Sequence, residues 1–219
     1  MMIDHLNSIP IYIGHVKNYR MHVDILDQYI NDDSYFGSVN GWVSDVKTTF
    51  RQDKNRDLPW QIILEDLNGY IQEYLEVLSP VSEYHYKTHM WMNRYSKGEY
   101  MEPHDHISKS DQISFAYILN SQGQNNFVFE NRVDWINSFD NNDLTGTVFT
   151  NIPLNNYIPE QKDGTLLIFP SSTIHYVTPN TSDGLRITIS GNISIKPGKH
   201  FVDERDSTLK TKNVKVLDI

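Results

Sequence analysis

The chain has 219 residues, no cysteine and a formal net charge of −9 at neutral pH. Its length suits one domain with a full hydrophobic core, because two domains of this total length would each be small. The absence of cysteine excludes disulfides, iron–sulfur clusters, thiolate zinc sites and a cysteine nucleophile. The acidic charge disfavours nucleic acid as a partner, since proteins that bind it usually carry a basic face.

The composition also bears on membranes and on secretion. No apolar run approaches the roughly 18 residues that a membrane span needs. The first residues of the chain lack the basic and apolar segments of a secretory signal. We therefore expect a cytoplasmic protein with no membrane partner, and the sequence leaves its oligomeric state unknown.

The N-terminal part of the chain contains two amphipathic helical patterns. A short strand is predicted before them over residues 9–13, and Pro10 indicates that it lies at the edge of a sheet. Residues 18–31 and 58–78 then repeat apolar side chains at helical spacing. We expect both helices to pack on the outer face of a sheet.

Beyond residue 80 the apolar side chains alternate with a period of two, as in strands. Strands are predicted over residues 84–95, 114–119, 126–130, 164–170 and 185–193. Helices followed by short strands and Asn, Gly and Asp turns predict a mostly β fold with supporting helices. We expect a cupin-like jelly roll, the double-stranded β-helix. In its last strand Leu185 and Ile187 should pack against the helices, and Arg186 and Thr188 should line the interior.

We expect a single domain over residues 1–219. Residues 1–80 are predicted to form a helical support region, 81–195 the jelly-roll core, and 196–219 an irregular C-terminal extension. The Asn- and Asp-rich stretch 134–161 is too long for a hairpin turn. It is either an insert that faces the substrate or a solvated surface loop.

The segment His104-Asp105-His106, followed by His175 and Arg186, is the pattern with the most chemical content. His104 and His106 share one face of an extended strand, because strand side chains alternate. His175, from a distant strand, can complete one face of a metal's coordination shell. Arg186 can then hold a carboxylate in a bidentate fork. This is the layout of a non-haem iron site that also binds 2-oxoglutarate.

The residues leave the third metal ligand open. We predict a facial site of His104, His106 and His175. Asp105 or Asp111 could instead supply the carboxylate of a two-histidine, one-carboxylate triad. Asp105 would need a bulge, because a regular strand points it to the opposite face, and Asp111 would need its loop to fold back.

Residues 93–192 resemble the 2-oxoglutarate/Fe(II)-dependent oxygenase superfamily. The resemblance is to its prolyl-hydroxylase-like side and to a branch common in marine bacteria and phages, so a phage origin is also an expectation. It rests on an ordered set of segments: Asn93–Gly98, Tyr100–His106, Ser114–Asn120, Gly123 before Phe127 and Phe129, Gly164–Pro170, His175, and Arg186–Ser190.

The resemblance implies a dioxygenase, most often a hydroxylase of a protein side chain or a small molecule. Such enzymes use iron(II), O2 and 2-oxoglutarate, which is decarboxylated to succinate. His104 and His175 match the first and last iron ligands. Arg186 matches the residue that pairs with the distal carboxylate of 2-oxoglutarate, with Thr188 beside it as a hydroxyl donor. Three further positions fall near the cosubstrate in relatives: Asn93, Tyr95 and Tyr117.

The chain departs from the family pattern at two places. The usual motif is His-x-Asp, where this chain has His106, and the usual strand ends in two tyrosines, where this chain has Tyr117-Ile118. Two other classes of protein are therefore kept as alternatives. A metal-binding cupin, an isomerase or dioxygenase that does not use 2-oxoglutarate, fits the spacing of Gly98 and His104. It lacks the second cupin motif and gives Arg186 no role. A non-enzymatic jelly-roll binding module would need no metal.

Overall fold

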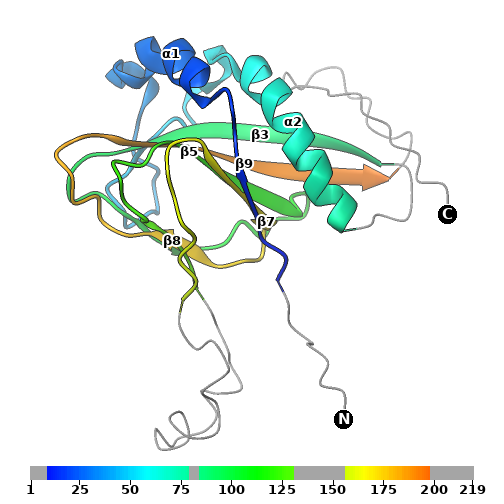
Figure 1. Ribbon diagram of the computed structural model, residues 1–219. Helices are drawn as coiled ribbons and strands as arrows, with labels where there is room; N and C mark the ends of the chain where they lie inside the picture. The colour runs from blue at the N-terminus through cyan, green and yellow to red at the C-terminus, as the bar shows by residue number, and fades with distance from the viewer. Residues whose placement is uncertain (1–8, 79–83, 131–155, 198–219) are drawn as a thin grey trace, which may run out of the picture.

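The computed structural model describes residues 9–78, 84–130 and 156–197. Its strands form a large and a small antiparallel sheet, and both helices lie over the large one (Figure 1). The helices are α1 (Tyr19–Ile30) and α2 (Trp60–Val77), and two 3-10 turns, Asp33–Tyr35 and Asp53–Asp57, lie between them. Among the described residues no helix combines the length and the apolar character needed to cross a membrane.

The large sheet runs in the order β1 (Tyr12–His15), β7 (Thr165–Pro170), β5 (Ile113–Asn120), β9 (Arg186–Pro197), β3 (Tyr84–Tyr95) and β2 (Lys47–Thr48). The small sheet runs in the order β4 (Met101–His104), β8 (His175–Val177) and β6 (Phe127–Phe129). Every strand pair in both sheets is antiparallel. The predicted mostly β jelly roll is confirmed.

The larger hydrophobic core fills the space between the helices and the large sheet. From α2 it takes residues at helical spacing, among them Ile63, Leu64, Leu67 and Ile71, all at most 1% exposed. From the strands it takes every second residue: Phe115, Tyr117 and Leu119 of β5, and Ile187, Ile189 and Ile193 of β9. This alternation confirms that the isoleucine face of the last strand packs against the helices.

A second hydrophobic core lies on the other face of the large sheet, toward the small sheet. Its members come from both sheets and include Tyr95, Met101, Ala116, Phe127, Phe129, Leu167, Phe169 and Val177. The candidate site lies in this inner space, because Arg186 and Thr188 alternate with the isoleucines of β9 and so face away from the helices.

Several predicted boundaries need adjustment. Both predicted helices are present, each ending within two residues of its predicted bounds. The region before residue 80 is more than a helical support, because β1 and β2 join the large sheet at its two edges. Strand β9 also runs two residues past the predicted end of the core at 195. Most of the predicted insert and nearly all of the C-terminal extension lie outside the described residues, so their roles stay predictions.

A buried polar contact ties the helices to the sheet. His22 of α1 is fully buried, with its Nδ1 2.9 Å from the Tyr117 hydroxyl and its Nε2 3.0 Å from the Asp66 carboxylate of α2. Burial lowers the pKa of His22 and outweighs the opposing effect of Asp66. A neutral imidazole fits both contacts, since Nε2–H donates to Asp66 and Nδ1 accepts from the tyrosine.

Candidate metal centre

Three histidines converge in the space between the two sheets. His104 ends β4 and lies opposite His175, the first residue of β8. His106 follows just beyond β4, where its backbone N–H donates to the Ser171 carbonyl at 2.8 Å. The ring centroids are 4.4 to 5.1 Å apart, and one possible ligand atom from each ring lies within 4.8 Å of the other two.

Hydrogen bonds at Nδ1 orient all three rings. His104 Nδ1 lies 2.7 Å from the Glu102 carbonyl, and His175 Nδ1 lies 2.8 Å from the Thr173 carbonyl. His106 Nδ1 lies 2.7 Å from Asn192 Oδ1. Because these oxygens only accept, each Nδ1 carries the proton and each Nε2 keeps a free lone pair. Three such nitrogens are a donor set that suits iron(II).

The rings are also held in the protonation state that a metal requires. Burial lowers the pKa of His104 and lowers that of His106 to about 4. Burial also lowers the pKa of His175 well below its usual value, and the neighbouring histidines add to this shift. All three imidazoles are therefore neutral at neutral pH, so a metal ion would not have to displace protons from the nitrogens that bind it.

The structure leaves both alternative aspartates outside this cluster. Asp105 Oδ1 accepts a hydrogen bond from the Ile107 backbone N–H at 3.0 Å. The Asp111 carboxylate accepts from the hydroxyls of Ser108 and Ser194, at 2.8 and 2.7 Å. Both line the cavity beside the histidines. Among the described residues, the three histidines alone form a group with converging ligand atoms.

Arg186, at the start of β9, is a buried cation that has no ion-pair partner within residues 9–78, 84–130 and 156–197. Its side chain is fully buried, and its Nε lacks any hydrogen-bond acceptor. Nη2 donates to Gln161 Oε1 at 3.0 Å, and Nη1 reaches the Gln124 carbonyl at 3.5 Å. Burial lowers its pKa to about 10, which still leaves it charged at neutral pH. A buried charge in this state is costly and favours an incoming carboxylate.

Three of the predicted cosubstrate residues line the cavity. Asn93 and Thr188 face it from neighbouring strands, with Asn93 Nδ2 3.3 Å from Thr188 Oγ1. Tyr95 also lines it and lies close to Arg186 and Thr188, and burial raises the pKa of its hydroxyl. Arg186 is adjacent to this wall without being part of it. We expect a carboxylate to reach the guanidinium past the side chains of Tyr95 and Thr188.

The structure separates Tyr117 from the other predicted site residues. Its hydroxyl contacts His22 in the helix-side core, and its side chain is absent from the cavity wall. The reason is the alternation of β5, which points Tyr117 to the same face as Phe115 and Leu119. We therefore leave Tyr117 out of the proposed cosubstrate site.

An aromatic wall, formed by Trp42, Phe50 and Trp91, was missed by the sequence prediction. The Trp91 ring lies 5.7 Å from His106 and 4.8 Å from Phe50, and Trp42 stacks on Phe50 at 5.8 Å. All three line the cavity. The alternation of β3 was a usable signal, because it places Trp91 on the same face as Asn93 and Tyr95.

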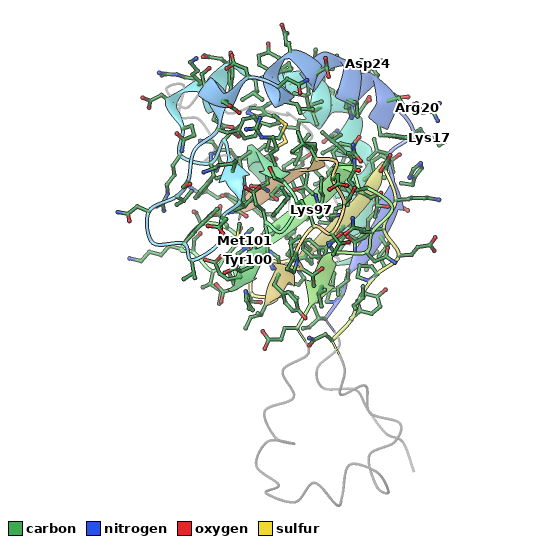
Figure 2. All side chains as sticks on the ribbon, turned by 90° about the vertical axis from the view of Figure 1, so that its left-hand side faces the viewer. Lys17, Arg20, Asp24, Lys97, Tyr100 and Met101 are labelled. Carbon is green, nitrogen blue, oxygen red and sulfur yellow. The ribbon has the colours of Figure 1, made fainter. Side chains whose placement is uncertain are left out.

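The cavity that joins these groups has a volume of about 360 Å³. Its lining includes the three histidines, the aromatic wall and the polar side chains of Asn93 and Thr188. Figure 2 labels Tyr100 and Met101, which mark the start of β4. Met101 is one of the residues that line the cavity. The volume is in the range of small-molecule binding sites.

Comparison with known proteins agrees with this site. Residues 89–192 match a family described as "Putative 2OG-Fe(II) oxygenase". No curated protein sequence gives a significant match. The matched residues run from His89, within β3, to Asn192 of β9, and so include all three histidines and Arg186.

Solved structures share the fold at low sequence identity. A prolyl-4-hydroxylase from Pseudomonas putida is 13% identical, with a TM-score of 0.55 over 85% of this chain and 93% of its own. A 2OG-Fe(II) oxygenase family oxidoreductase from Burkholderia pseudomallei is 12% identical, with a TM-score of 0.56 over 84% of both chains. A prolyl hydroxylase from Trichoplax adhaerens, in complex with a hypoxia inducible factor peptide fragment, is 12% identical, with a TM-score of 0.55 over 84% of this chain and 83% of its own.

These findings confirm the resemblance drawn from the sequence motifs. The matched segment carries the histidine cluster, and the shared fold extends the likeness to most of the chain. The expected cofactors, iron(II) and 2-oxoglutarate, are those of the matched family. Residues 89–192 are thus similar to the 2-oxoglutarate- and iron(II)-dependent oxygenases, and most of the chain shares the fold of solved members of that group.

Proposed function

We propose that the chain is a dioxygenase, specifically a hydroxylase, that oxidises an organic substrate while 2-oxoglutarate is decarboxylated to succinate. The observation that carries the proposal is the pairing of two features beside one cavity. Three neutral imidazoles converge at one place, and next to the cavity wall lies a buried arginine that has no ion pair in the part of the chain that the structure describes. A dicarboxylate that also chelates a metal through its 2-oxo acid group satisfies both features.

The protein residues have separate tasks in this proposal. His104, His106 and His175 would hold iron(II) through their Nε2 atoms. When bound, iron(II) supplies the centre at which O2 is activated and the 2-oxo acid is decarboxylated. Arg186 and Thr188 bind the distal carboxylate and so fix the direction of the cosubstrate. Because the three ligands are neutral, the charge of the metal would be balanced by the dianionic cosubstrate.

The aromatic wall is where we propose that the substrate binds. Trp91 and Phe50 extend from His106 along one side of the cavity, and the Arg51 guanidinium lies 5.1 Å from the Phe50 ring centroid. Such faces bind rings and apolar side chains by stacking and dispersion. Two of the similar structures are prolyl hydroxylases, one of them with a peptide fragment. We propose a protein side chain or a small molecule with an apolar ring or chain as the substrate.

The proposal predicts slow turnover of 2-oxoglutarate even without the substrate. Purified protein with iron(II), ascorbate and O2 should convert 2-oxoglutarate to succinate, measured by proton NMR. His175→Ala should abolish the conversion because it removes a metal ligand, whereas His15→Ala, an exposed histidine of β1, should not. Wild-type protein that forms no more succinate than a metal-free sample would contradict the proposal. Metal-dependent chemistry without 2-oxoglutarate would instead indicate the cupin alternative.

A further inference from the structure

Gln161 makes four hydrogen bonds from a buried side chain that is 5% exposed. Its Oε1 accepts from the Phe127 backbone N–H at 2.9 Å and from Arg186 Nη2 at 3.0 Å. Its Nε2 donates to the carbonyls of Phe127 at 2.9 Å and Pro159 at 3.2 Å. Two donors face the oxygen and two acceptors face the nitrogen, so only this orientation of the amide satisfies all four.

The same amide is the closest hydrogen-bond partner of Arg186 among the described residues. The remaining contact, to the Gln124 carbonyl, is at the 3.5 Å limit, and Nε has no partner. Tyr95 and Asp163 are the other titratable groups that act on the guanidinium. Asp163 already accepts hydrogen bonds from the backbone N–H and the hydroxyl of Ser121, at 2.7 and 2.8 Å. The guanidinium is thus anchored by a neutral group and forms no direct ion pair among the described residues.

Gln161 is also connected to the histidine cluster, through its hydrogen bonds to Phe127. The Phe127 backbone pairs with both polar atoms of the amide, and the Phe127 ring stacks on His175 with centroids 5.1 Å apart and planes 15° apart. A merely structural role for Gln161 would therefore disturb the metal end and the arginine end together. A role in holding Arg186 would change only the binding of a distal carboxylate.

We propose that Gln161 is a positioning residue for the cosubstrate: it fixes the Arg186 guanidinium while leaving its charge free for the distal carboxylate of 2-oxoglutarate. The inference rests on the proposed function. A carboxylate at position 161 would neutralise Arg186 and repel the distal carboxylate. It would also face the carbonyls of Phe127 and Pro159, to which it cannot donate unless protonated. A neutral amide avoids both conflicts.

The test compares two ligands in the manganese(II)-loaded protein by calorimetric titration. 2-Oxopentanoate has the same five-carbon 2-oxo acid chain as 2-oxoglutarate but lacks the distal carboxylate. In Gln161→Glu the affinity for 2-oxoglutarate should fall by about 30-fold or more, as expected when a buried charge pair is lost. The affinities for 2-oxopentanoate and for manganese(II) should stay within about 3-fold of wild type. Gln161→Met, which keeps the length but adds no charge, should give a smaller loss.

Gln61→Glu makes the same change of charge on the exposed face of α2 and should bind both ligands like wild type. An equal loss of both ligands or of the metal in Gln161→Glu would overturn the proposal, because it would indicate a structural role. Unchanged 2-oxoglutarate affinity in that variant would overturn it as well. Wild-type protein that binds manganese(II) but not 2-oxoglutarate would overturn the proposed function itself, so the two failures are distinguishable.

Discussion

Arg186→Gln is expected to lower the affinity for 2-oxoglutarate by about 2–5 kcal/mol, because the distal carboxylate would be left buried without its cation. The guanidinium is fully buried and has no anionic partner of its own among the described residues, so its charge is available to the ligand. Manganese(II) affinity should not change, since no histidine of the cluster hydrogen-bonds to Arg186. Calorimetric titration of 2-oxoglutarate into the manganese-loaded variant measures the effect.

Arg94→Gln is the matched control for this variant. Arg94 lies on β3, outside the cavity lining. It forms an ion pair with Asp33 and donates a hydrogen bond to the carbonyl of Ile30, the last residue of α1. Its loss should leave the affinity for 2-oxoglutarate as it is. Equal affinities in Arg186→Gln and in wild type would remove Arg186 from the cosubstrate site.

His106→Ala is expected to lose metal affinity by about 100-fold or more, because removing even an outer partner of a metal ligand costs about 10–100-fold. Asp111→Ala should retain the metal, since both oxygens of Asp111 are bound to serine hydroxyls and lie outside the histidine cluster. Titration of each variant with manganese(II), followed by electron paramagnetic resonance, measures the free and bound metal. If Asp111→Ala lost the metal and His106→Ala kept it, the third ligand would be the carboxylate.

The sequence predicted those parts of the fold that depend on local periodicity. The spacing of Ile63, Leu67 and Ile71 marks α2, and the alternation of Arg186 and Ile187 marks which side of β9 faces the helices. The convergence of His104 with His175 was expected from the order of the motif, whereas the short strands β4 and β8 that place these residues opposite each other were not predicted.

Other features depend on contacts between distant segments and could not be predicted in this way. The loop after His106 is shaped by the hydrogen bond between Ser194 and Asp111, 83 residues apart, so the choice of third ligand stayed open. Gln161 meets Arg186 only because the segment before β7 runs beside β6, and no pattern marks this contact. The position of Tyr117, in contrast, could have been predicted from the local sequence pattern. The resemblance placed it near the cosubstrate, whereas the alternation of β5 already indicated the helix side.

Anaerobic addition of iron(II) and 2-oxoglutarate, followed by visible absorption spectroscopy, tests the central claim most directly. The account predicts a weak charge-transfer band that requires both components and that is absent in His175→Ala. The band reports chelation of the 2-oxo acid at the metal and does not depend on knowing the substrate. Iron(II) binding without a band on addition of 2-oxoglutarate would contradict the account and favour a cupin, and a protein that binds no iron(II) would favour a binding module.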